Sequence, residues 1–158
     1  MLSTYDDGVG VLTIGAGHTA MAGTPTPTPG MTITLVEAIN IFRRDIKKYE
    51  SGVENALTVP VNQHQFDALV SWHYNTGSIA TATLTKKINA GDITGAASEF
   101  VRWNKAKGKV LKGLTKRRKD EAAIFSNADY GDPNVLVFKT KGGSAETLNK
   151  NDVIELMQ

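Results

Sequence analysis

The amino-acid sequence predicts an α+β fold, with a small β element at the N-terminus followed by a mostly helical body. Residues 1–19 are rich in glycine, threonine and valine, a composition typical of short strands and turns. Several segments after residue 33 instead repeat apolar residues at spacings of three and four, the period of a helix that buries one face. With 158 residues, 41% of them hydrophobic, the chain is long enough for one domain with a buried core.

The N-terminal β element is expected to be a short hairpin or two short strands. Asp7-Gly8 is a turn signal, and Val9, Val11 and Ile14 are strand formers. The alternate prolines of residues 24–30 then remove hydrogen-bond donors and restrict φ. We therefore expect an extended surface loop between the β element and the helices.

The helical body begins with two helices whose N-terminal caps are readable. Thr34 and Glu37 form a capping box, and the helix that follows should end near Gly52. Asn62, with a glutamine three residues later, starts a second helix that should stop at residues 75–77.

Three further helices are predicted from the same apolar spacing: residues 84–90, the segment from Asp92 to Trp103, and residues 114–125. Lys107-Gly108 should break the chain between the last two. Trp72 and Trp103 both occupy apolar helical positions, which favours core packing over an exposed binding platform.

The last 30 or so residues have a different character. The sequence predicts a turn at residues 132–134, a strand at residues 135–138, a flexible joint at residues 142–144 and a final turn of helix at residues 153–157. No function for this tail follows from the residues themselves.

Composition excludes several kinds of site. The chain has no cysteine, so disulfides, a thiol nucleophile and a cysteine-based zinc site are excluded, and none of its 3 histidines pairs with an acid at metal-binding spacing. We therefore expect no metal and no cofactor. No apolar run approaches the ~18 residues that a membrane-spanning helix needs, so we expect no membrane span in this chain.

The basic residues are unevenly placed. Residues 102–119 contain no acid and half of the 18 lysines and arginines, although the formal net charge is only +2. Such a run is either an ordinary solvated face or a surface for a polyanion, which would be a nucleic acid or an anionic polymer of the cell envelope. The segment lacks interleaved aromatic residues and any nucleic-acid-binding motif, so we expect no nucleic-acid partner.

The run from Tyr5 to Thr19 contains the residues most suited to chemistry. Asp7 lies at a glycine-rich turn, and Thr13 follows six residues later. Across a tight hairpin, a carboxylate and a hydroxyl can face one gap and orient a water molecule between them. Gly15 and Gly17 would allow a sharp bend or a close approach to a ligand. An ordinary β-turn followed by a capping histidine, His18, explains the same residues without chemistry.

This run resembles the signature of the phage-type lysozymes, glycoside hydrolases that cut peptidoglycan. The family pattern is matched in order and spacing by Tyr5, Asp7, Thr13, Gly15, Gly17 and His18. The resemblance continues through residues 31–38, 68–77, 84–95, 103 and 113–121. It spans about residues 2–126, which implies a lysozyme-like domain over residues 1–126 and a C-terminal extension of unknown role over residues 127–158.

The resemblance implies a muramidase of the endolysin type, which cleaves the β-1,4 bond between N-acetylmuramic acid and N-acetylglucosamine during bacterial lysis. Its substrate would be peptidoglycan glycan strands. We expect a monomer that is encoded by a phage, made in the host cytoplasm and released to the periplasm or cell wall. An alternative is a catalytically inactive relative of the same fold that still binds wall glycan.

Residue roles carry over position by position. Asp7 would be the second catalytic carboxylate, and Thr13 would position water or substrate. Asn75, His18 and Arg117 are the candidate substrate-binding residues. For His18 a structural hydrogen-bonding role behind the hairpin is preferred to proton transfer, and Arg118 is the alternative to Arg117.

The sequence departs from the family pattern at the general acid. A glycosidase of this kind needs a protonated acid as well as a second carboxylate. The family's glutamate would lie nine residues before Asp7, ahead of Met1, and the first glutamate present is Glu37. Three explanations stay open: Met1 is an internal methionine of a longer protein, the chain is an inactive binder, or an acid such as Glu155 replaces the missing one.

Overall fold

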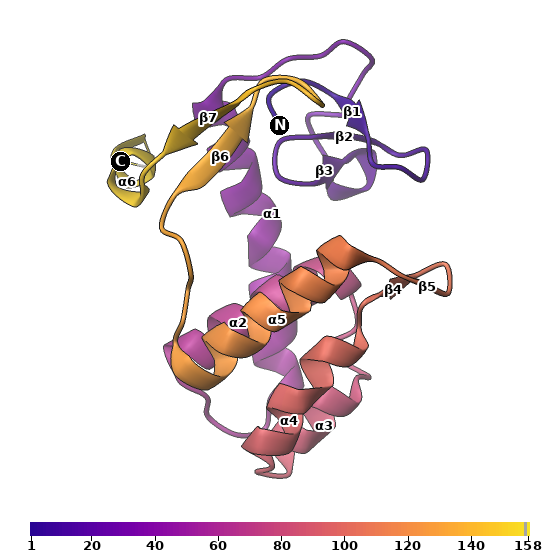
Figure 1. The fold of residues 1–158 in the computed structure, drawn as a ribbon, viewed down its shortest axis with the longest axis vertical. Coiled ribbons are helices and arrows are strands. Elements are labelled where there is room, and N and C mark those ends of the chain that lie inside the picture. The colour runs from indigo at the N-terminus through magenta and orange to yellow at the C-terminus, as the bar shows by residue number, and fades with distance from the viewer. Residues whose placement is uncertain (157) are drawn as a thin grey trace. The chain divides into compact units, whose positions relative to one another are not determined.

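The computed structural model describes residues 1–156 and 158 and divides them into two compact units. The first unit contains Met1–Lys47 and Asp132–Gln158, and the second contains Lys48–Gly131. Helix α1 (Leu35–Ala56) contributes to both units (Figure 1). Each unit is described by itself.

The first unit contains a three-stranded antiparallel sheet in the order β1 (Tyr5–Asp6), β2 (Leu12–Ile14), β3 (His18–Thr19). The predicted hairpin is confirmed, and a third short strand extends it. Val9 and Val11 are strand formers but lie in the exposed turn between β1 and β2. The carboxylates of Asp6 and Asp7 accept hydrogen bonds from the backbone amides of residues 8–11. These local bonds take the place of the cross-strand hydrogen bonds that the two valines would make in a longer strand.

After a short 3₁₀ turn, η1 (Ala20–Ala22), the chain runs without regular structure to α1, as the prolines predict. The capping box at the start of α1 is confirmed. The Thr34 amide donates to Glu37 Oε2 at 2.7 Å, and the Glu37 amide donates to Thr34 Oγ1 at 3.2 Å.

The prediction that α1 ends near Gly52 is wrong, because the helix continues to Ala56. Gly52 serves a different purpose: a Cβ atom at this position would lie 2.7 Å from Nε2 of His73. The glycine therefore allows His73 of α2 to approach the α1 backbone within the second unit, and it does not mark a helix end.

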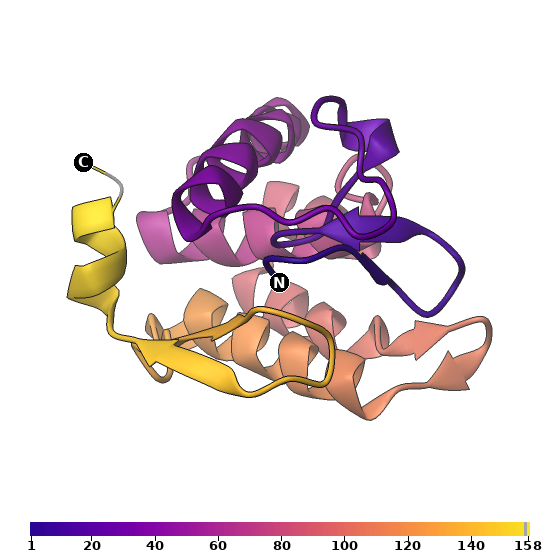
Figure 2. The ribbon, with the colours of Figure 1, turned by 90° about the horizontal axis from the view of Figure 1, so that it is seen from above.

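The tail forms a second hairpin in the first unit. Strand β6 (Val135–Phe138) pairs antiparallel with β7 (Ala145–Leu148), and α6 (Lys150–Leu156) follows (Figures 1 and 2). The predicted strand at residues 135–138 is confirmed, whereas the predicted flexible joint at residues 142–144 belongs to the tight connection between β6 and β7. The final helix begins earlier than predicted, and Met157 lies outside the described residues.

The second unit is mainly helical. Its helices are α2 (Gln63–Thr76), α3 (Thr83–Asn89), α4 (Ile93–Glu99), which continues into a 3₁₀ turn, η2 (Phe100–Arg102), and α5 (Lys112–Asn127). The Asn62 capping box of α2 is present, and Asp92 caps α4 through the Gly95 amide at 2.8 Å. The predicted break at Lys107-Gly108 is the tip of a small hairpin, β4 (Lys105–Ala106) and β5 (Lys109–Val110), where both residues have positive φ.

Trp72 lies at the centre of the second unit and is fully buried, as predicted. Phe100, Phe125 and Leu69 are buried in the same core. Trp103 is 37% exposed, so the expectation of a core position is wrong for this residue. It packs edge-to-face on Trp72, with ring centroids 5.0 Å apart, and closes the rim of the core.

No helix among the residues that the structure describes combines the length and the apolar composition needed to cross a bilayer.

Candidate functional site

The loop between β1 and β2, called here the Asp7 loop (residues 6–12), is built on two carboxylates. Oδ1 of Asp6 accepts from the amides of Gly8 at 2.7 Å and Gly10 at 3.2 Å. Oδ1 of Asp7 accepts from the amides of Val9 at 2.9 Å and Val11 at 3.1 Å. These bonds hold one oxygen of the exposed Asp7 carboxylate and do not use its other oxygen, Oδ2.

Thr13 lies on the same hairpin but faces inward. Its side chain is buried, and its hydroxyl donates to the carbonyl of Val11 at 3.1 Å. Val11 thus binds Asp7 through its amide and Thr13 through its carbonyl. The structure brings the two predicted residues to one peptide segment, and their sharing of a water molecule stays a prediction.

His18 is 1% exposed and engages both ring nitrogens. Nδ1 lies 2.6 Å from Oδ2 of Asp45, and Nε2 lies 2.8 Å from the Pro25 carbonyl. Both partners are acceptor groups, one on each side of the ring. His18 thereby joins β3 to α1 and to the proline-rich loop, which fits the structural role; a substrate contact for His18 stays a prediction.

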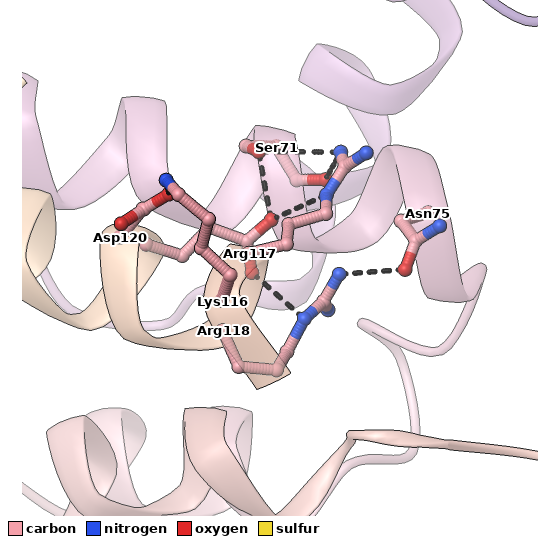
Figure 3. A network of polar contacts seen from close by, with 7 residues as sticks. Ser71, Asn75, Lys116, Arg117, Arg118 and Asp120 are labelled. Atoms are coloured by element: carbon pink, nitrogen blue, oxygen red, sulfur yellow. Dashed lines mark hydrogen bonds and ion pairs between the residues drawn. The ribbon is translucent and has the colours of Figure 1, made fainter. Parts of the chain in front are cut away.

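A second group of polar residues lies in the helical unit and is called here the Arg118 network: Ser71, Asn75, Arg117, Arg118 and Glu121 (Figure 3). Glu121 accepts from Ser71 Oγ at 2.8 Å and from Arg117 Nε at 3.0 Å, and its Oε2 lies 3.2 Å from Arg118 Nε. Arg117 also donates from Nη2 to the Ser71 carbonyl at 2.9 Å. The network connects α2 to α5.

Asn75 is the exposed end of this network. Its Oδ1 accepts from Nη2 of Arg118 at 2.6 Å, while the Arg118 side chain is fully buried. Burial lowers the pKa of the Arg118 guanidinium, the Glu121 carboxylate opposes that shift and Arg117 adds to it. An arginine with a lowered pKa still carries its charge at neutral pH, so two cations share the one buried carboxylate of Glu121.

Sequence reasoning gave Arg117, Arg118 and Asn75 a role at the site but assigned none to Ser71, Glu121 or Asp45. Glu121 follows Arg117 by four residues and Arg118 by three, so helical spacing could have identified it. Ser71 and Asp45 carried no such signal, because their partners lie 50 and 27 residues away along the chain.

The basic run of residues 102–119 is only partly neutralised. Arg102, Lys116, Arg117 and Arg118 each pair with an acid of the same unit. The remaining five basic residues are exposed and have no ion-pair partner in the part of the chain that the structure describes: Lys105, Lys107, Lys109, Lys112 and Lys119. A groove of about 330 Å³ on α5 is lined by Lys112, Thr115, Lys116 and Lys119.

Within the described residues, no three His, Cys, Asp or Glu side chains gather in a way that could hold a metal ion.

Comparison with known proteins gives a consistent result. Residues 1–121 match the family model described as Phage lysozyme. The endolysin of Bacillus phage B103 is 36% identical over 146 residues, an alignment that covers 90% of this chain and 54% of that relative. The chain therefore spans about half of that relative's length.

Two solved structures extend the likeness to the fold. The endolysin from Escherichia coli O157:H7 phage FAHEc1 superposes with a TM-score of 0.76 at 36% identity, covering 84% of this chain and 87% of that one. The muramidase domain of SpmX from Asticaccaulis excentricus gives a TM-score of 0.70 at 28% identity, covering 80% and 86%. The α+β, lysozyme-like fold predicted from the sequence is confirmed.

Proposed function

Because this chain belongs to the phage lysozyme family, we propose that it is a peptidoglycan hydrolase that cleaves the β-1,4 bonds between N-acetylmuramic acid and N-acetylglucosamine. The observation that carries the proposal is the Asp7 loop: an exposed carboxylate, matched to the family motif, is held by two backbone amides through Oδ1 alone. Oδ2 would then be available to orient an attacking water or to stabilise positive charge on the sugar ring.

The other site residues support this role in different ways. Thr13 would hold the water or the substrate beside Asp7. Asn75 and Arg117 would contact the glycan, the role that the family resemblance implies for them. His18 supports the hairpin from behind through Asp45.

The general acid is the part of the mechanism that the matched motif does not supply. Glu37, the first glutamate, is occupied by the capping box with Thr34, which lowers the pKa of its carboxyl. A general acid needs the opposite shift. Glu155, the replacement that the sequence suggests, lies exposed on α6 in the unit that also holds Asp7. Its assignment stays a prediction.

The exposed lysines of residues 102–119 would assist by attraction. Bacterial walls are anionic polymers, and a field from five unpaired lysines concentrates the protein at such a surface. This attraction should weaken as salt is added, because ions screen exposed charges. We propose that the protein acts as a monomer and that its partner is the peptidoglycan glycan strand. We propose no nucleic-acid partner.

Turbidity loss of a purified wall suspension tests the proposal. The chain should clear the suspension, and Asp7→Asn should abolish clearing while it keeps its Tm. Glu146→Gln, an exposed carboxylate on β7, is the matched control and should clear normally. Glu155→Gln should also abolish clearing if Glu155 is the acid.

The inactive alternative has its own signature in the same assay. A chain that pellets with the walls but never clears them would be a glycan-binding module. A chain that neither clears nor pellets would contradict both readings.

A further inference from the structure

The C-terminal hairpin β6–β7 is bonded to the first residues of the chain. The Leu2 amide donates to the Phe138 carbonyl at 2.9 Å, and the Ile33 amide donates to the Leu2 carbonyl at 2.8 Å. Val137 of β6 is 8% exposed, so the hairpin buries apolar surface as well as exchanging hydrogen bonds. The tail is therefore folded into the first unit, the one that contains Asp7.

One residue of the hairpin reaches the Asp7 loop. Lys141 lies in the connection between β6 and β7, and its Nζ donates to the backbone carbonyl of Asp6 at 2.8 Å. This connection is itself closed by the Gly143 amide, which donates to the Thr140 carbonyl at 3.1 Å. The lysine is thus presented from a short closed turn.

The bond acts directly on the backbone of Asp7. The carbonyl of Asp6 and the amide of Asp7 belong to one planar peptide group. Its carbonyl accepts from Lys141, and its amide donates to the Val11 carbonyl at 3.1 Å. The peptide that leads into Asp7 is held at both ends.

The loop needs such a restraint. Gly8 and Gly10 both have positive φ, of 95° and 89°, and a Cβ at either position would meet nothing within 4 Å. Glycines of this kind give the unrestrained loop many alternative conformations. A charge-assisted hydrogen bond to the peptide beside Asp7 reduces that freedom.

We propose that the C-terminal hairpin is part of the catalytic unit and that Lys141 is a positioning residue for Asp7. The inference rests on the proposed function, since it assigns the tail a role in placing that carboxylate. Lys141 does not touch the substrate; it fixes the peptide from which Asp7 projects. Residues 132–158 then contribute to the unit that holds Asp7.

A second effect of Lys141 gives an independent spectroscopic signature. The pKa of the Asp6 carboxyl is held below its ordinary value by the Gly8 and Gly10 amides and, to a smaller extent, by the charge of Lys141. Removing the charge should raise the pKa of Asp6 without removing the two amide bonds.

The test compares Lys141→Met with Lys139→Met. Lys139 is an exposed residue two positions away with no hydrogen-bond or ion-pair partner among the described residues, so it controls for loss of charge on the same hairpin. In ¹⁵N-HSQC spectra, Lys141→Met should shift the Asp7 and Val11 amide signals, and the pKa of Asp6 measured by NMR titration should rise. Lys139→Met should leave all three unchanged.

Wall clearing adds a kinetic readout. Lys141→Met should reduce kcat by about two- to tenfold with little change in KM, the loss expected for one positioning hydrogen bond. Lys141→Arg, which keeps a charged donor, should restore most of the rate. A general loss of folding would instead lower Tm and change the amide signals of residues throughout the first unit.

The results that overturn the inference are distinct from those that overturn the proposed function. Unchanged Asp7 and Val11 signals in Lys141→Met, or equal effects from Lys139→Met, would refute the role of Lys141 whether or not walls are cleared. Absence of clearing by the unmodified chain would refute the proposed hydrolase activity. The NMR comparison would still show whether Lys141 positions the Asp7 loop.

Discussion

Arg118 donates from Nη2 to Oδ1 of Asn75 at 2.6 Å, and this bond fixes the direction in which the Asn75 amide faces. A guanidinium has donors and no acceptor, so only the oxygen of the amide can face it. The amide nitrogen of Asn75 is then turned away from Arg118, and this exposed residue presents two N–H donors. A glycan bound here would have to offer an acceptor, such as the carbonyl of an acetamido group.

Asn75→Asp separates this donor role from folding. An aspartate still accepts from Arg118 and adds an opposite charge, so Tm should be unchanged or higher. It has no N–H group, so binding of an N-acetylglucosamine–N-acetylmuramic acid tetrasaccharide should weaken by about two- to tenfold in calorimetric titration. Asn127→Asp, an exposed asparagine at the end of α5, should bind as the parent does. Unweakened binding by Asn75→Asp would remove Asn75 from the substrate-binding residues.

Glu121→Gln tests the buried part of the Arg118 network. The carboxylate is 2% exposed and faces two guanidinium groups, so neutralising it leaves buried positive charge without a counterion. The free energy of unfolding should fall by about 3–5 kcal/mol in urea denaturation. The control is Asp120, the residue before Glu121, which forms an exposed ion pair with Lys116. Asp120→Asn breaks that pair and should lower the free energy of unfolding by about 0.5 kcal/mol or less. Equal losses in the two variants would show that the network does not stabilise the helical unit.

Asp45→Ala tests the support behind the hairpin. The side chains of Asp45 and His18 are 5% and 1% exposed, and Asp45 also pairs with Arg44. Its removal should lower the free energy of unfolding by about 1–3 kcal/mol, because the buried Nδ1 of His18 loses its hydrogen-bond partner. Glu54→Ala, an exposed carboxylate on the same helix, should change it by about 0.5 kcal/mol or less. A small loss at Asp45 would indicate that its bond to His18 does not support the hairpin.

Glu99 should make the helical unit sensitive to acid. Its pKa is lowered, chiefly by the hydrogen bond from Lys87 at 2.6 Å, from an ordinary value of 4.5. A carboxyl whose pKa is lower in the folded state stabilises that state at any pH above its pKa in the unfolded chain. This stabilisation is lost as the pH falls through the pKa of the folded state. Lys87→Met should therefore reduce Tm by about 2–4 °C at pH 7 and by less at pH 3. Lys86, exposed on the same helix, is the control, and Lys86→Met should show no such pH dependence. If Lys87→Met lowered Tm equally at pH 7 and pH 3, Glu99 would not be the source of the acid sensitivity.

The sequence predicted features that depend on neighbours along the chain. The capping boxes at Thr34–Glu37 and Asn62–Gln65 are pairs three residues apart, and both form as expected. The Asp7-Gly8 turn is equally local. Features that depend on distant partners were not predictable: Gly52 looked like a helix end because nothing in the sequence shows that His73 packs against it.

The tail illustrates the same limit. Strand β7 has the sequence Ala-Glu-Thr-Leu, which has little strand preference of its own, and it exists because it pairs with β6. Within the candidate site, the sequence identified Asp7, Thr13, Asn75 and Arg117 through the family motif. It could not show that the hydroxyl of Thr13 binds the Val11 carbonyl, since a motif records residue types and not their orientations.

The identity of the sugar at each newly formed reducing end tests the central claim most directly. Walls digested by this chain are reduced with borohydride, hydrolysed and analysed for amino-sugar alcohols. The account predicts that muramic acid is converted to muramitol in the digest, and that Asp7→Asn produces none above the undigested background. New reducing ends on glucosamine, or clearing that produces no new reducing ends at all, would contradict it.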